Sequence, residues 1–156
     1  MFESNIISIN NIRKGNFSWE IDFEKAEHTT SGGMVFQGAV TFEVKEYNNS
    51  SNTISNEIII GKCNIGVVIT DASESKNEIG RYDVEYHIEI EPTEELLEQI
   101  KNDKEDKEKE IKMFIMYILE PYFRYDFETV MYDAALPKNI LPYGILHRFV
   151  ITDETK

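Results

Sequence analysis

The sequence predicts a single α+β domain, in which a four-stranded antiparallel sheet is followed by a long helix. The chain has 156 residues, a length typical of one domain. Residues 5–91 show apolar and polar positions in alternation, the pattern of strands with one buried and one wet face. Residues 93–136 instead have the apolar spacing of helices, and residues 137–156 are expected to be an extended C-terminal segment.

Four strand regions are predicted in the first part of the chain. The region Glu57–Asp71 is more uniformly apolar than the others, and Gly61 and Gly66 within it are expected to mark a bulge or bend. The segment 6–9 is the candidate start of the first strand, before Lys14-Gly15 interrupts it. The alternating apolar positions are Trp19, Ile21 and Phe23; Val40, Phe42 and Val44; and Tyr82, Val84, Tyr86, Ile88 and Ile90.

The connections between these regions carry turn-forming residues. Residues 31–33, 48–52 and 71–77 are small and polar, as in tight links between neighbouring strands. Four strands joined in this way predict an antiparallel meander, in which each strand lies beside the next one in the chain.

A helical region follows Pro92. Thr93 is a candidate N-cap, and acidic residues occupy the first turn after it. The tract Lys101–Glu110 is almost entirely charged, which fits either an exposed helix with many ion pairs or a loop.

The segment Ile111–Leu136 has the strongest helical pattern, and Pro121 inside it predicts a kink or a helix boundary. Its apolar residues cover more than half of the helix circumference. One sheet face covers only one stripe of a helix, so a second apolar contact is expected, and a second subunit is the simplest candidate.

Composition limits the partners and the compartment. The net charge of −13 disfavours nucleic acid and anionic membranes as partners. Cys63 is the sole cysteine, so no internal disulfide forms, and a cytoplasmic location is expected. The first residues lack the features of a signal peptide, and no apolar run approaches the ~20 residues that span a bilayer.

No catalytic motif is present, so we expect no enzyme activity, no cofactor and no metal site. His87 lies between Glu85 and Glu89 on the wet side of one strand, an arrangement that fits a metal or proton site but is better explained as a solvated strand face. Cys63 lies in an apolar strand without a neighbouring histidine, which favours an inert core thiol over a nucleophile.

Two segments resemble the SecB family of export chaperones. Pro121-Tyr122-Phe123-Arg124, followed by Leu136-Pro137 and then Asn139-Ile140-Leu141-Pro142, is similar to the family pattern F-P-Y-A-R-E, helix, F-P-x-L-x-L-x-P. Lys14-Gly15-Asn16-Phe17-Ser18-Trp19-Glu20 resembles the first-strand pattern K-D-x-S-F-E with one inserted residue. The resemblance covers residues 5–144. The chain departs from the family after Pro142, where the second helix and the metal-binding tail are missing.

The resemblance implies a homo-oligomer, a dimer or a tetramer, with helices at the subunit contacts. It implies apolar grooves that hold unfolded client proteins, and possible transfer to the SecA motor. Glu20 matches an acidic family residue that contacts SecA, whereas the neighbouring family Asp is replaced by Gly15 or Asn16.

These observations lead to the hypothesis of a holdase chaperone that binds unfolded or partly folded clients, with protein export as one use. The alternatives are a structural or accessory interaction protein, including a chaperone dedicated to one antitoxin, and a small enzyme with a site around His87. The residues expected to contact clients or other subunits are Trp19, Phe42, Tyr82, Tyr86, Phe114, Tyr122, Phe123 and Phe127.

Overall fold

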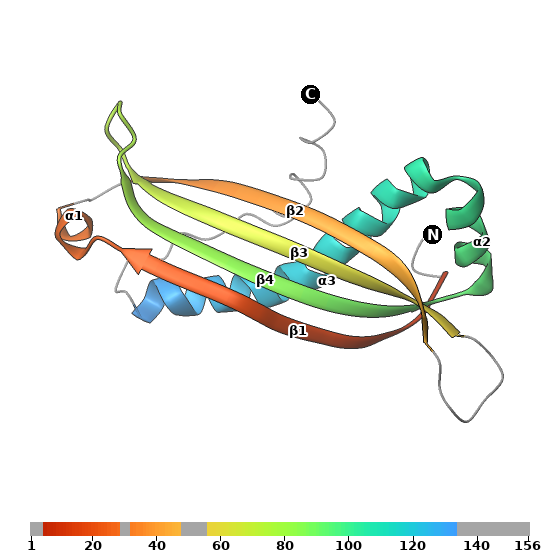
Figure 1. Ribbon diagram of the computed structural model, residues 1–156. Coiled ribbons are helices and arrows are strands. Elements are labelled where there is room, and N and C mark those ends of the chain that lie inside the picture. Colours follow the sequence, from red (N-terminus) through yellow and green to blue (C-terminus); the bar gives the residue numbers. More distant parts are fainter. Residues whose placement is uncertain (1–4, 29–31, 48–55, 134–156) are drawn as a thin grey trace.

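The computed structural model describes residues 5–28, 32–47 and 56–133, and Figure 1 shows a long sheet with the longest helix along one side. This confirms the predicted class, a four-stranded antiparallel sheet followed by a long helix. The predicted extended segment 137–156 lies outside the described residues. In chain order the elements are β1 (Ile6–Ile21), α1 (Phe23–Glu27), β2 (Gly32–Tyr47), β3 (Asn56–Asp71), β4 (Glu78–Pro92), α2 (Glu94–Asn102) and α3 (Lys104–Asp133).

The strand order is β1-β4-β3-β2, so the predicted meander is wrong for the first strand. Strands β2, β3 and β4 pair in sequence, but β1 lies beside β4, which gives a Greek-key arrangement. The apolar side chains of β1 join the buried row of β4 in this order, with Trp19 opposite Tyr82 and Ile12 opposite Ile88. Turn residues indicate that strands are linked, but only this tertiary pairing decides which strands are neighbours.

Strand β1 is continuous through Lys14-Gly15, where an interruption was predicted. The pairing with β4 shifts between Lys14 and Phe17, so an irregularity of the bulge type absorbs the extra residues within the strand. The strand also ends earlier than predicted. Asp22 caps α1 by accepting a hydrogen bond from the backbone N–H of Lys25 at 3.1 Å, and Phe23 is therefore the first residue of a helix.

The two glycines of β3 do not mark a bulge, since β2 and β3 pair without any shift in register. Gly61 instead allows α3 to approach the sheet closely. A Cβ atom at this position would lie 2.7 Å from Ile115 Cδ1 of α3 and 2.8 Å from Ile88 Cγ2 of β4. Both of these side chains are fully buried, so neither has room to move.

Gly61→Ala is therefore expected to destabilise the protein by about 1–3 kcal/mol, the usual range for overpacking a core. Gly66→Ala, on the same strand but the opposite face, is the matched control. Its Cβ would meet the end of the Asp83 carboxylate, which is able to turn away, so a change within about 0.5 kcal/mol is expected. Urea denaturation measures both variants, and equal losses would contradict this role for Gly61.

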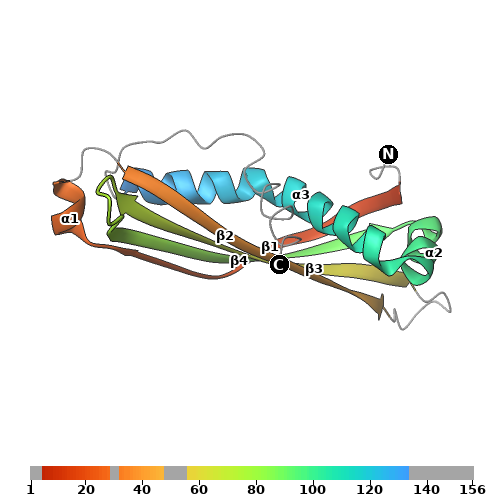
Figure 2. The ribbon, with the colours of Figure 1, turned by 90° about the horizontal axis from the view of Figure 1, so that it is seen from above.

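The helical region follows the prediction at its start. The hydroxyl oxygen of Thr93 accepts a hydrogen bond from the N–H of Leu96 at 3.3 Å and caps α2. The charged tract Lys101–Glu110 is helical apart from Asp103, because α2 ends at Asn102 and α3 begins at Lys104. Helix α3 continues through Pro121, which excludes the predicted boundary there, and its axis bends between its two halves (Figure 2). Residues 134–136, the expected end of this helix, lie outside the described part of the chain.

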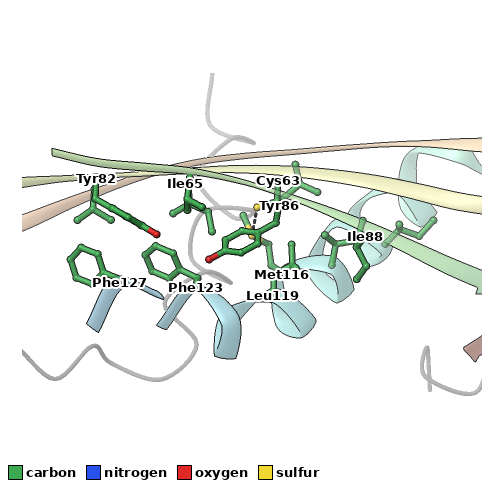
Figure 3. Close-up of a cluster of buried hydrophobic side chains, with 14 of the residues drawn as sticks. Cys63, Ile65, Tyr82, Tyr86, Ile88, Met116, Leu119, Phe123 and Phe127 are labelled. Atoms are coloured by element: carbon green, nitrogen blue, oxygen red, sulfur yellow. Dashed lines mark hydrogen bonds between the residues drawn. The ribbon is translucent and has the colours of Figure 1, made fainter. Parts of the chain in front are cut away.

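The hydrophobic core lies between α3 and the sheet face that it covers, which we call the inner face (Figure 3). It combines the alternate residues of β3 and β4 with one side of α3, as the period of two in the strands predicts. Its largest fully buried side chains are Tyr82, Tyr86, Phe123, Phe127, Ile59, Ile65, Ile88, Ile90, Leu96, Ile111, Ile115 and Met116.

Candidate functional site

The inward side of α3 carries phenylalanines that are completely buried. Phe123 and Phe127 stack on each other with ring centroids 5.7 Å apart. Tyr82 of β4 lies 5.6 Å from Phe127, and Phe36 of β2 packs edge-on against both phenylalanines at 6.5 Å. We call these four rings the aromatic cluster; Figure 3 shows three of them between β4 and α3. The cluster stabilises the docking of α3 within one subunit.

The outward side of α3 carries a second set of aromatic residues, and these are tyrosines. Tyr125 is 73% exposed, Tyr117 55% and Tyr122 49%, and Tyr132 near the end of the helix is 66% exposed. At 100° per residue, the stripe points away from the buried phenylalanines. We call this set the outer stripe, together with the partly buried residues beside it: Phe114, Tyr117, Ile118, Tyr122, Tyr125 and Tyr132.

The difference between the two sides is chemical as well as geometric. A phenylalanine has only apolar atoms and belongs in a dry core, whereas a tyrosine presents a large apolar ring that tolerates water at its hydroxyl. Tyrosines are accordingly common on surfaces that bind and release partners. The outer stripe therefore has the composition of a surface that can bind a partner through its rings and can also remain exposed to water when no partner is bound.

The eight predicted contact residues separate into two groups. Tyr82, Tyr86, Phe123 and Phe127 are at most 2% exposed and belong to the core of the subunit, so they offer no surface to a partner in the closed structure, and their role as contacts stays a prediction. The other four retain accessible surface: Tyr122 is half exposed, and Trp19, Phe42 and Phe114 are partly buried against the core.

Sequence reasoning missed Tyr117, Tyr125 and Tyr132, which are among the most exposed large side chains of the described residues. A signal was available in the sequence. Within α3 the fully buried aromatic residues are Phe and the exposed ones are Tyr, so the residue type itself separates the two sides of the helix.

A polar network joins the inner face to α3. The hydroxyl of Tyr86 donates a hydrogen bond to Asp126 Oδ2 at 2.5 Å, and Lys14 Nζ lies 3.3 Å from Asp126 Oδ1. Burial, together with the Asp126 carboxylate that accepts this bond, raises the pKa of Tyr86 well above its ordinary value. Burial raises the pKa of Tyr82 in the same way, and its hydroxyl lies near that of Tyr86 without reaching hydrogen-bond geometry with any described residue.

The opposite, outer face of the sheet is hydrophilic along β4. The Glu85 carboxylate accepts hydrogen bonds from Lys62 Nζ at 2.7 Å and from His87 Nε2 at 2.6 Å. These two bonds lower the pKa of its carboxyl group. His87 therefore already has a carboxylate partner on a solvated face, as predicted. The described residues contain no group of three or more potential metal ligands. Glu20 is exposed on β1, opposite Arg81 of β4.

A shallow hollow of about 540 Å³ crosses the middle of the sheet. Its lining combines small residues such as Gly66 and Ala39 with the amides of Asn64 and Gln37 and the carboxylate of Asp83. No arrangement of nucleophile, base and oxyanion donor is found in it.

Cys63 occupies the core position that the sequence predicts. Its side chain is fully buried, and its Sγ atom lies 3.6 Å from Met116 Sδ. Burial raises the pKa of this thiol to about 12, so it stays protonated at neutral pH and is a poor nucleophile.

None of the helices in the described residues is long and apolar enough to cross a membrane. This finding agrees with the absence of a spanning apolar run in the sequence.

Comparison with known proteins identifies the fold. No protein-family model and no curated protein sequence matches the chain. Among solved structures, the chain is similar to the SecB-like chaperone Rv1957 of Mycobacterium tuberculosis, solved in complex with a ChAD peptide from the HigA1 antitoxin. The TM-score is 0.50 at 14% sequence identity, over 92% of this chain and 96% of that chain. The four-stranded sheet and the long helix of this protein therefore have the fold of a SecB-like chaperone.

Proposed function

We propose that this protein is a chaperone of the holdase type, which binds non-native segments of other proteins without catalysing a reaction. The observation that carries the proposal is the outer stripe of α3, where large tyrosine rings remain exposed beside partly buried apolar side chains. The similarity in fold to a chaperone that binds a peptide supports the same role.

Burial of ring surface drives the proposed binding. Burying apolar area contributes about 25 cal/mol per Å² to the binding free energy. The loss of conformational entropy when a flexible client becomes ordered offsets part of this gain. The predicted contact residues that keep accessible surface, Trp19, Phe42, Phe114 and Tyr122, lie on the inner face or on α3 and belong to the proposed contact area. Such binding requires no nucleotide, so release occurs through competition with client folding or transfer.

The oligomeric state and the export role are part of the proposal. A second copy of the chain is the simplest partner for apolar surface that the sheet does not cover, which favours a dimer or a tetramer. Glu20, exposed on the outer face, remains the proposed acidic contact for SecA. We propose a cytoplasmic location, where unfolded precursors are available before export.

A dedicated chaperone for one antitoxin is the second candidate. The observation that favours it is that the structurally similar mycobacterial chaperone was solved with a peptide from an antitoxin. The same outer stripe would then serve one partner segment instead of many.

The holdase is tested by light scattering of an unrelated protein that aggregates on dilution from denaturant. The native chain is expected to suppress scattering at a stoichiometric ratio, and the double variant Tyr122→Gln, Tyr125→Gln is expected to lose most of this effect. Both rings contact the solvent, so the variant should retain the stability of the native chain within about 1 kcal/mol.

Phe23→Gln provides the matched control, because Phe23 is 62% exposed but lies on α1 instead of α3. It should leave suppression unchanged. No suppression by the native chain would contradict the general holdase and favour the dedicated chaperone, whereas equal losses in both variants would contradict the role of the stripe. Static light scattering on the same samples gives the mass, which for a tetramer is four times 18.2 kDa.

A further inference from the structure

The two halves of α3 are attached to the sheet in different ways. In the first half Ile111, Ile115 and Leu119 are completely buried, and Ile115 fits against Gly61 with no room for an added Cβ atom. The second half contributes Phe123 and Phe127 to the aromatic cluster. It is also held by Asp126, which accepts a hydrogen bond from Tyr86 and forms an ion pair with Lys14. The first attachment rests on closely fitted aliphatic side chains, and the second combines rings with an ionised group.

Pro121 separates these two halves inside a continuous helix. Proline has no backbone N–H, so the helix lacks the hydrogen bond that this residue would donate to the carbonyl one turn earlier. The missing bond lowers the resistance of the helix to bending at this position, and the axis of α3 bends between its halves (Figure 2).

The polar attachment consists of Lys14, Tyr86 and Asp126, which we call the latch. Lys14 lies on the inner face because β1 pairs regularly with β4 from Ile12 to Lys14, which places Lys14 opposite Tyr86. The Asp126 side chain keeps 19% of its surface and that of Lys14 keeps 39%, so water competes with the latch. The latch is consequently open to water at its Lys14 and Asp126 side chains.

The neighbouring Tyr82 acts in the opposite direction. Its hydroxyl is buried against the second half of α3 and forms no hydrogen bond with the described residues. A buried donor without a partner is unfavourable, and it regains its hydrogen bonds when water reaches it. Tyr82 thus stabilises a state in which the second half has moved away, relative to the closed state seen here.

We propose that residues 122–133 form a flap that opens about Pro121 when the latch breaks, while the first half of α3 stays on the sheet. Opening exposes the aromatic cluster, which offers rings from both the flap and the sheet to an apolar segment. As a way of admitting clients the flap rests on the proposed chaperone function, but its opening is measured without any client.

Hydrogen–deuterium exchange of the full chain, resolved by peptide mass spectrometry, tests the proposal. In the native chain residues 122–133 are expected to exchange faster than residues 111–120. Tyr86→Phe removes the latch bond to a charged group and should speed exchange in the flap alone by about tenfold or more. Lys14→Met is a milder second variant and should act in the same direction.

Two variants are expected to slow exchange in the flap. Tyr82→Phe removes the unpaired hydroxyl, and Pro121→Ala restores the helix bond at the hinge. The opposite signs of Tyr82→Phe and Tyr86→Phe separate a flap from general loosening, since both variants delete one buried hydroxyl from the same strand. Equal exchange in both halves of α3, or parallel changes in both halves across the variants, overturns the flap. A holdase assay that fails leaves these exchange results unaffected.

Discussion

Phe123→Ala is expected to destabilise the protein by about 3–5 kcal/mol, the range measured for removing a buried phenylalanine ring. Phe123 is completely buried and contacts Phe36, Tyr82 and Phe127, so the deletion leaves a cavity between α3 and the sheet. A domain of ordinary stability, about 5–15 kcal/mol, loses a large fraction of it. Urea denaturation followed by the fluorescence of Trp19, whose ring lies 6.3 Å from that of Tyr82, measures the change.

Tyr122→Ala is the matched control, because it removes a ring of similar size from the adjacent position on the same helix. Tyr122 is half exposed, so a loss of about 1 kcal/mol or less is expected. Similar losses for the two variants would show that both rings are buried, and would contradict the assignment of Phe123 to the core and Tyr122 to the outer stripe.

Raising the pH above 9 is expected to destabilise the fold strongly. Burial raises the pKa of Cys63 from 9.0 to about 12. Between these two values the unfolded chain has released the thiol proton while the folded chain retains it. The unfolded state then binds fewer protons, so the free energy of unfolding falls as the pH rises. At 1.36 kcal/mol for each pH unit, the whole window corresponds to about 4 kcal/mol as an upper value. Tyr82 and Tyr86 contribute in the same direction, because burial raises their pKa values as well.

Cys63→Val isolates the contribution of the thiol, since valine is apolar, similar in size and does not titrate. Between about pH 8 and about pH 10.5, the native chain should lose about 2 kcal/mol more stability than the variant. Urea denaturation of both proteins at the two pH values gives this difference. Parallel losses in the two proteins would show that Cys63 ionises as freely in the folded state as in the unfolded one.

Several features of the fold were predictable because they depend on neighbours in the sequence. The alternation in β4 predicts a strand with one buried face, and Thr93 followed by acidic residues predicts the start of α2. The location of Cys63 in an apolar strand predicts an inert core thiol. Each of these features depends on the periodicity of the sequence or on a hydrogen bond within one turn. Both involve residues that are close together in the chain, so they can be predicted from the sequence.

The candidate site was predicted less completely. The excess of apolar residues on α3 predicts a second contact surface, but it does not say which rings occupy the core. Half of the predicted contact residues, including Phe123, are part of the core. The identity of the outer stripe depends on which side of α3 turns toward the sheet, and the close fit of Ile115 against Gly61 is part of what fixes that side.

The amino-acid sequence alone determined the α+β class, the four strands followed by a helical region, the acidic net charge and the absence of a recognisable catalytic motif. Only the tertiary structure decided that β1 lies beside β4, that Gly61 admits the helix, and that Lys14, Tyr86 and Asp126 meet. The physical reason is distance along the chain. Asp126 is 112 residues from Lys14 and 40 from Tyr86, and contacts of that kind form only when the whole core is packed.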